Sequence, residues 1–451
     1  MKARELKRLM CAATLSLVFI TGCANGNTAV SVQTNGVETG ETVVSFEEEP
    51  GETGENEPIS TSETSETPVQ TTIAVNVDIR SKFPDAYSFK TIGNGRYIIL
   101  TDVDGRHNTT QIEVYDAASD TVVGTAQFNT YGEWWPDVVV YEGQGFGMIT
   151  ESHGNGGNSN SIIASYYDMD GNLLNAFVKS YERGWYYETY TLAPDGSALY
   201  VSLSDREQCA CGFDFKADYV TRIYGVYGNN QEEVIAEFDS HYSISIMGVR
   251  DDGKIAVRYY YDPNEKVILT HKEYETMSML AVSDKNPGES GLAFIDSDAS
   301  ADHSLEKVFK IEKYYGNEMC FKGNAFVLVS DDEIVRIAKD ANGNYKETSY
   351  EVTIGADGVY FGGEALVSPN GEYVIFSTFS EDTNDTTVSV VHFNEDEAEL
   401  VYENFNPNMR ITFTEYLATM FDESNGNLYG KFDDTSEGGR PNRPYFVNIY
   451  E

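Results

Sequence analysis

Short apolar runs alternate with polar turns along most of the chain from residue 76 onward. Seven segments share one shape, in which a short strand, a turn containing glycine and a more apolar strand follow one another. They read TIGNGRYIILTD from Thr91, YEGQGFGMITES from Tyr141, LAPDGSALYVSLS from Leu192, VRDDGKIAVRYY from Val249, CFKGNAFVLVSD from Cys320, VSPNGEYVIFST from Val367 and DESNGNLYGKF from Asp422. Asn-Gly and Asp-Gly favour two-residue hairpin turns, because both central positions of such a turn need positive φ. The pattern therefore predicts seven β-hairpins.

The seven hairpins recur at a nearly regular interval. The glycines assigned to their turns are spaced by 50, 51, 57, 70, 48 and 55 residues, and they are Gly95, Gly145, Gly196, Gly253, Gly323, Gly371 and Gly426. Each hairpin is followed by a further pair of strand-like runs, as in 111–128, 161–178 and 388–403. Four antiparallel strands in about 50 residues make one propeller blade. The prediction is an all-β, seven-bladed β-propeller, with six or eight blades as alternatives.

A run of β-sandwich domains is the competing interpretation, and the regular spacing without a Cys…Trp…Cys pattern argues against it. Two of the hairpins, SPNGEYVIFST and APDGSALYVSL, resemble the recurrent motif of TolB-type and WD-like bacterial propellers. The resemblance covers residues 76–451 by architecture and implies no activity. We expect the propeller domain to comprise residues 71–451.

The last repeat predicts how the ring closes. It contains three strands before the chain stops, whereas TTIAVNVDI at residues 71–79 is a strand-like run without a partner. An N-terminal strand can complete the last blade of a propeller, so we expect residues 71–79 to pair with the strand around Val447 and Ile449. The alternative is that residues 71–79 belong to the segment before the ring.

Residues 1–22 have the features of a signal peptide. A basic start (Lys2, Arg4, Lys7 and Arg8) precedes an apolar run from Leu9 to Ile20, which is short for a stable transmembrane helix. The run ends in Ile-Thr-Gly-Cys23, which resembles the bacterial lipobox. The resemblance implies cleavage before Cys23 and a diacylglycerol thioether on its sulfur, which is sufficient for lasting membrane attachment. An ordinary secretory peptide with a chance cysteine is the alternative.

The composition of residues 23–70 predicts a disordered acidic linker. Residues 24–75 carry ten glutamates and no Lys, Arg or Asp, among many Thr, Ser and Gly. Such a segment has too little apolar surface to fold, and its like charges extend it. The lipobox and linker together suggest a lipoprotein on the outer face of the cytoplasmic membrane of a Gram-positive bacterium.

The overall charge excludes some partners. The chain has 31 Lys and Arg against 73 Asp and Glu, a formal net charge of −42. Such a chain repels phosphate backbones, so nucleic acid is excluded, and membrane contact is expected only through the lipid. We expect a monomer.

Motifs for known chemistries are scarce. The sequence has no G-x-S-x-G elbow and no H-E-x-x-H pair, so it predicts no metal site and no cofactor. Cys209-Ala-Cys211 is half a metal site at most, and free thiols are the simpler interpretation. The Asp-x-Asp-Gly runs at 102–105 and 168–171 superficially resemble calcium loops, but they lack an EF-hand's later ligands and are also ordinary turn chemistry. Whether calcium binds stays open.

Aromatic residues give the stronger functional signal. All three tryptophans, Trp134, Trp135 and Trp185, lie in segments that lead into an innermost strand. In a propeller these segments meet at the end of the channel that we call the upper rim, together with the connections between second and third strands. Stacking on a sugar or gripping a peptide suits such a rim. The candidate ligand-binding residues are Trp134, Trp135, Trp185, Tyr186, Arg106 and His107. The alternative is that these aromatics seal contacts between blades.

Two functions are compatible with these observations. The first is a non-enzymatic binding or scaffold module for a protein partner or glycan at the upper rim. The alternative is a surface enzyme that acts on glycans or cell-wall material through carboxylates in the central funnel, although spacing alone cannot select a pair among 73 acids. An insertion at residues 262–289 would lie on the upper face, as a lid or as decoration.

Overall fold

The structure, a computed structural model, describes residues 79–450 except 104, 106–107, 131–135, 154–158, 183–184, 206–218, 264–287, 299–303, 314, 317, 353–358, 362–364, 414–418 and 435–441. The chain divides into two compact units, residues 1–73 and 74–451. All described residues lie in the second unit. No helix among them is long and apolar enough to cross a membrane.

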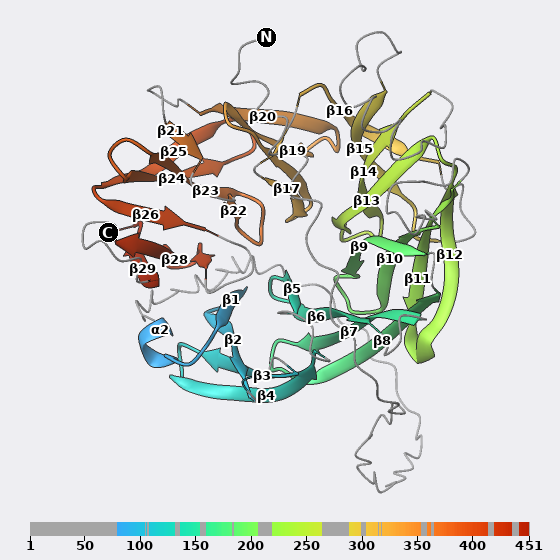
Figure 1. Ribbon diagram of the computed structural model, residues 1–451, viewed down its shortest axis with the longest axis horizontal. Coiled ribbons are helices and arrows are strands. Elements are labelled where there is room, and N and C mark those ends of the chain that lie inside the picture. Colours follow the sequence, from blue (N-terminus) through green and yellow to red (C-terminus); the bar gives the residue numbers. More distant parts are fainter. Residues whose placement is uncertain are drawn as a thin grey trace, which may run out of the picture. The chain divides into compact units, whose positions relative to one another are not determined.

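The described residues form a seven-bladed β-propeller, as the sequence predicted (Figure 1). Each blade is one antiparallel sheet whose strands follow one another in chain order, with the first strand innermost. Blade 1 consists of β1 (Ser88–Gly93), β2 (Arg96–Asp102), β3 (Thr109–Asp116) and β4 (Thr121–Asn129), and blade 2 of β5 (Asp137–Tyr141), β6 (Gly145–His153), β7 (Ser159–Asp168) and β8 (Leu173–Glu182). Blade 3 consists of β9 (Tyr186–Leu192), β10 (Ala198–Ser204), β11 (Thr221–Tyr227) and β12 (Gln231–Phe238). Blade 4 consists of β13 (Tyr242–Val249), β14 (Ile255–Tyr261), β15 (Glu289–Ile295) and β16 (Glu306–Ile311).

In blades 6 and 7 the innermost strand is interrupted. Blade 5 consists of β17 (Glu318–Lys322), β18 (Ala325–Val329), β19 (Glu333–Lys339) and β20 (Tyr345–Glu351), and its first strand is continuous. Blade 6 consists of β21 (Val359–Phe361), β22 (Leu366–Val367), β23 (Tyr373–Ser380), β24 (Asp385–Phe393) and β25 (Ala398–Asn406), and both β21 and β22 pair with β23. Blade 7 consists of β26 (Met409–Thr412), β27 (Met420–Asp422), β28 (Asn427–Asp434) and β29 (Asn442–Asn448), and both β26 and β27 pair with β28. Two short helices complete the described elements, α2 (Ile79–Lys82) and the 3₁₀ turn η1 (Gly228–Asn230).

The burial of each strand follows from its place in the blade. The second strands β10 and β18 are buried along their whole length, because neighbouring strands pair with both edges and neighbouring blades cover both faces. The outer strand β4 is mostly exposed, with the burial of Phe128 as an exception. Continuous apolar runs are typical of strands that are covered on both faces. This explains why the second strand of each hairpin is the more apolar one in the sequence.

One hydrophobic cluster fills each interface between adjacent blades. The seven clusters of buried residues each contain side chains from two neighbouring blades, and the seventh joins blade 7 to blade 1. In that seventh cluster Met420 and Tyr429 pack against Phe89, Tyr97 and Ile99. The ring of blades is therefore closed by packing among described residues, and Figure 1 shows β28 and β29 beside β1 and β2.

The N-terminal strand expected at residues 71–79 is partly wrong. Ile79 begins helix α2 instead of ending a strand, and its side chain is fully buried at the interface between blades 7 and 1. Residues 71–78 lie outside the described residues. Among the described residues no fourth strand pairs with β29, so blade 7 has the three strand positions that the sequence predicted.

One turn glycine was assigned wrongly. The turn of the second blade uses Gly143, whose φ is +68°, whereas Gly145 is the first residue of β6. Gly145 is needed for a different reason. A Cβ at this position would lie 2.3 Å from the backbone oxygen of Tyr167 on the paired strand, so the residue serves close packing and not a left-handed turn.

Candidate functional site

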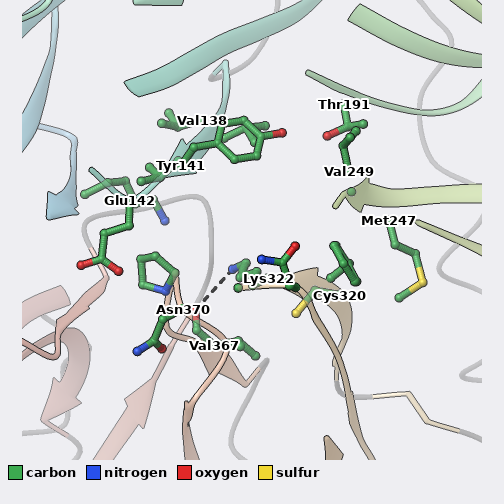
Figure 2. Close-up of a pocket in the computed structure, with 18 of the residues that line it drawn as sticks. Val138, Tyr141, Glu142, Thr191, Met247, Val249, Cys320, Lys322, Val367 and Asn370 are labelled. Atoms are coloured by element: carbon green, nitrogen blue, oxygen red, sulfur yellow. Dashed lines mark hydrogen bonds between the residues drawn. The ribbon is translucent and has the colours of Figure 1, made fainter. Parts of the chain in front are cut away.

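A cavity of about 650 Å³ occupies the channel at the centre of the ring (Figure 2). Its wall contains residues of the first strand of every blade. They include Thr91 of β1, Val138 of β5, Thr191 of β9, Met247 of β13, Cys320 of β17, Val367 of β22 and Phe421 of β27. The volume is in the range of small-ligand sites in proteins, roughly 300–1,000 Å³. The seven-fold arrangement thus produces one shared cavity on the axis.

The wall of the cavity is not uniformly acidic, although the chain is. Lys90, Arg258 and Lys322 line it together with Glu142 and Glu318. The Lys322 ammonium donates a hydrogen bond to the backbone oxygen of Val367 at 3.3 Å, shown as the dashed line in Figure 2. Arg258 comes from a second strand, where it is paired with the small residue Ser245. Both signs of charge are therefore available to a ligand in the channel.

The turns between first and second strands form the other end of the channel, which we call the lower mouth. These turns are joined from blade to blade by hydrogen bonds. Gly143 donates its N–H to the carbonyl of Ile92 at 3.0 Å, and the Asn324 amide donates to Asp251 at 2.6 Å. The Arg336 guanidinium donates to the carbonyl of Gly371 at 2.9 Å. These bonds fix each of the three turns to a neighbouring blade.

Two carboxyl groups meet at the lower mouth. Glu142 follows β5 of blade 2, Glu423 follows β27 of blade 7, and their side chains are hydrogen bonded. Burial, followed by the charge of Glu142, raises the pKa of Glu423 from 4.5 to about 8. Burial and the neighbouring carboxyl group thus both favour the protonated form of Glu423. Its Oε2 atom is buried and has no hydrogen-bond partner among the described residues.

A glycine of blade 1 lets Glu142 reach this position. Gly93 has a φ of +85°, and a Cβ there would lie 2.5 Å from Cγ of Glu142. The glycine is required twice, for its left-handed backbone and for the close approach of the glutamate. In Figure 2 Glu142 extends from blade 2 along the side of the cavity where Asn370 of blade 6 lies.

At the upper rim, blades 2 and 3 bring aromatic rings and carboxylates together. The Tyr190 hydroxyl donates a hydrogen bond to Asp137, and the Tyr181 hydroxyl donates to Glu151. Burial, reinforced by the neighbouring carboxylates, raises the pKa of both tyrosines far above 10. Both hydroxyls therefore remain donors at all physiological pH values. The Tyr187 ring is 40% exposed and lies 5.8 Å from the Tyr190 ring, centroid to centroid.

Trp185 combines packing with partial exposure. It packs against the cluster between blades 2 and 3, and the Arg222 guanidinium lies over its ring at 5.1 Å. Arg222 is held by Glu237, whose carboxylate accepts its Nε–H at 2.7 Å. The structure therefore places Trp185 at a contact between blades.

The other predicted binding residues are placed only in part. Tyr186 is the first residue of β9, at the upper end of the channel. Trp134, Trp135, Arg106 and His107 lie outside the described residues, as do Cys23, Cys209 and Cys211. The insertion joins β14 to β15, and its residues 264–287 are outside the described residues as well.

The two Asp-x-Asp-Gly runs contain turns stabilised by their first aspartate. Asp102 accepts the N–H of Gly105 at 3.1 Å, and Asp168 accepts the N–H groups of Asp170 and Asn172 at 2.9 and 2.8 Å. Within the described part of the chain, no group of three or more His, Cys, Asp or Glu residues is arranged to hold a metal ion.

No protein-family model matches the chain. No curated protein matches it either. The solved structures that resemble it share little sequence. The β-propeller domain of the Trilobed protease from Pyrococcus furiosus is 13% identical, with a TM-score of 0.39, over 80% of this chain and 95% of that one. A prolyl endopeptidase is 11% identical, with a TM-score of 0.42, over 81% of this chain and 47% of that one. The Synechocystis apocarotenoid oxygenase is 11% identical, with a TM-score of 0.39, over 70% of this chain and 74% of that one.

Sequence reasoning missed the carboxyl pair at the lower mouth. Glu142 and Glu423 lie in two different repeats, and neither stands in a motif. The ring brings them together only because blade 7 returns beside blade 1. A weak signal was present in the turns themselves, since Glu142 precedes Gly143 and Glu423 occupies the corresponding turn of the last blade.

Proposed function

We propose that the chain is a lipid-anchored, extracytoplasmic β-propeller that binds a glycan or a protein partner at its upper rim without transforming it. The anchor is the lipid on Cys23, and residues 23–70 serve as a spacer between membrane and ring. The bacterium would be Gram-positive, with the propeller on the outer face of its cytoplasmic membrane. The ring supplies a rigid frame on which a binding surface can be built.

The arrangement at blades 2 and 3 is the observation that carries the binding role. An exposed aromatic ring, Tyr187, lies beside Tyr190, whose hydroxyl bonds to Asp137. An aromatic face stacks on the C–H face of a sugar, and fixed carboxylates accept hydrogen bonds from its hydroxyls. The same ring could hold an aromatic or aliphatic side chain of a protein. Trp185 and Arg222 lie on the same blades and extend this surface.

The alternative of a glycan-degrading enzyme has less support from the channel. Glycoside hydrolases place two carboxyl groups about 5–5.5 Å or about 6.5–9.5 Å apart on either side of the bond that breaks. Glu142 lies close enough to Glu423 to raise its pKa, and Glu423 is not among the residues that line the cavity, so this pair does not flank a ligand in the channel. Binding is therefore the better-supported function.

The binding proposal is tested with a glycan array and with a pull-down on isolated cell-wall material. Tyr187→Ala should weaken the binding that is found by about tenfold or more, because an aromatic contact at the centre of an interface typically contributes over 1 kcal/mol. The melting temperature should change by only a few degrees, since the ring is substantially exposed.

Phe405→Ala is the matched control. Phe405 is 60% exposed but lies on the outer strand β25, away from the channel. This variant should bind as the wild type does. Equal loss of binding in both variants, or release of shortened glycans by the wild-type protein, would count against the proposed function.

A further inference from the structure

The central cavity is lined by apolar residues together with a few charged ones. The apolar residues come from five of the seven blades and include Val138, Met247, Met319, Val367 and Phe421. A predominantly apolar wall holds the hydrocarbon part of a small ligand, and a few polar groups fix its orientation. The charged residues of the wall therefore indicate which polar group a ligand would carry.

Basic residues are enriched in this wall. Six of the lining residues are charged, and three of them, Lys90, Arg258 and Lys322, are basic. The whole chain, in contrast, has 31 Lys and Arg against 73 Asp and Glu. The three basic residues belong to blades 1, 4 and 5, and in the ring of seven blade 1 lies opposite blades 4 and 5 (Figure 1). Positive charge is thus present on opposite sides of the axis, which favours an anion between them.

The three acidic residues of the wall lie toward its two ends. Glu142 and Asp251 belong to turns at the lower mouth, and Glu318 is the first residue of β17, at the end nearer the upper rim. The Asp251 carboxylate accepts the Asn324 amide at 2.6 Å, so it is engaged in holding two turns together. In Figure 2 Glu142 lies at the edge of the group of side chains, whereas the Lys322 ammonium lies near its centre. A ligand on the axis is therefore closer to Lys322 than to Glu142.

Hydrogen bonds between neighbouring blades hold the wall in place. The Thr189 hydroxyl accepts the N–H of Ile246 at 2.6 Å and joins blades 3 and 4. The Tyr141 hydroxyl donates to the carbonyl of Leu192 and joins blades 2 and 3. All four residues are part of first strands. The cavity is therefore formed before a ligand enters, which reduces the entropy lost on binding.

We propose that the central cavity binds a small amphipathic organic anion, whose charged group is attracted by Lys90, Arg258 and Lys322 and whose apolar body packs against the first strands. A single negative charge fits better than several, because the net charge of −42 on the chain repels a multiply charged anion outside the cavity. This site goes beyond the upper-rim binding of the proposed function and does not depend on it.

Two dyes with the same apolar body test the proposal. 8-Anilinonaphthalene-1-sulfonate carries one sulfonate group, N-phenyl-1-naphthylamine has none, and both fluoresce more strongly in an apolar site. The wild-type protein should bind one equivalent of the sulfonate dye, measured by fluorescence titration. Inorganic pyrophosphate, which has several charges and no apolar body, should not displace it.

Charge-removing variants examine the role of the basic residues. Lys322→Gln and Lys90→Gln should each weaken binding of the sulfonate dye by about tenfold, the factor expected for one charge-assisted contact, and should change binding of the neutral dye by less than about twofold. Lys310→Gln is the matched control. Lys310 lies on the outer strand β16, where its exposed ammonium is 3.0 Å from Glu312, and this variant should bind both dyes as the wild type does. Melting curves establish that each variant is folded.

A second pair of variants locates the bound dye. Val138→Phe narrows the cavity and should weaken binding of both dyes. Val123→Phe makes the same change on the outer strand β4, where Val123 is 40% exposed, and should leave binding of both unchanged.

Each outcome decides the proposal. It is supported if the two cavity lysine variants weaken binding of the sulfonate dye alone while Val138→Phe weakens binding of both dyes. Unchanged affinity for the sulfonate dye in both lysine variants would overturn the anion site. Equal losses in Lys310→Gln or Val123→Phe would place the dye on the outer surface, and displacement by pyrophosphate would overturn the amphipathic class. Absence of sulfonate-dye binding by the wild type would overturn the site altogether.

Discussion

The interface between blades 7 and 1 differs from the interface between blades 3 and 4. The second is filled by a cluster of 15 buried residues among those described, of which twelve are aliphatic and only Tyr200 and Tyr259 carry hydroxyl groups. The first has a cluster of eight, of which Tyr97, Tyr115 and Tyr429 carry hydroxyl groups. Polypeptide runs directly from blade 3 to blade 4, whereas no short connection joins blade 7 to blade 1. The ring is thus closed at its smaller and more polar interface.

Hydrogen bonds complete the contact at this closing interface. The Tyr97 hydroxyl donates to the buried carboxylate of Asp422, and the Asn425 amide donates to the Tyr97 oxygen at 3.0 Å. The N–H of Ile79 donates to the Tyr429 hydroxyl at 3.3 Å. Buried polar groups are costly unless paired, so such a network permits only one arrangement of the two blades. The comparison suggests that closure here depends on specific pairing as much as on apolar area.

The largest effect on the melting temperature is expected from removing the segment before the ring. Proteins that begin at residue 71 and at residue 79 both keep Ile79, and they differ only in residues 71–78. If these residues form the outer strand of blade 7, the shorter protein exposes the edge of β29 and melts at a markedly lower temperature. Coincident melting curves would assign residues 71–78 to the linker and leave the interface closed by side chains alone.

A pair of matched substitutions compares the two interfaces directly. Tyr429 and Tyr259 are both 1% exposed, one at the closing interface and one between blades 3 and 4. Each change to alanine should lower the free energy of unfolding by about 3–5 kcal/mol through lost packing. Only Tyr429→Ala should also separate blades 7 and 1, since no short connection holds them.

Hydrogen–deuterium exchange distinguishes these two effects. In Tyr429→Ala the amides of β1 and β28 should lose protection under conditions where β10 and β18 keep it. In Tyr259→Ala protection should fall without this localisation. If both variants lose protection equally around the ring, the closing interface is no weaker than the others.

The sequence allowed the architecture to be predicted because the blade is a local unit. The hairpins starting at Leu192 and Val367 can be recognised by their Pro-Asp-Gly and Pro-Asn-Gly turns, which fix strand pairing within a few residues. Gly145 misled the assignment because the second hairpin has two glycines, and only Gly143 has positive φ. Which of the two glycines takes the positive-φ position of the turn depends on how the two strands pair. The local sequence pattern does not contain that information.

The site was harder to predict for the same reason. Aromatic segments such as 181–190 could be assigned to the upper rim from strand order alone, and the structure places Tyr187 and Tyr190 there. The hydrogen-bond partner of Tyr190, Asp137, comes from another blade. The Glu142–Glu423 pair requires the whole ring to close before the two residues meet. Contacts between repeats depend on how blades pack, and the spacing of repeats does not specify them.

The smallest effect tests whether the polar network at the closing interface is specific. Tyr97→Phe keeps the ring and its packing but removes the hydroxyl that donates to Asp422, a residue that is 2% exposed. Loss of a hydrogen bond to a buried charged group should lower the free energy of unfolding by about 1–3 kcal/mol. Tyr115→Phe is the control, because the Tyr115 hydroxyl bonds to Asp120 in an exposed turn, and its loss should cost less than about 1 kcal/mol.

The double variant Tyr97→Phe, Asp422→Asn, together with the two single variants, completes a double-mutant cycle. If the network acts as a unit, the two losses will not add, because either change alone already breaks the pairing. Additive losses would show that the two groups act independently, so that no coupled polar network holds the closing interface.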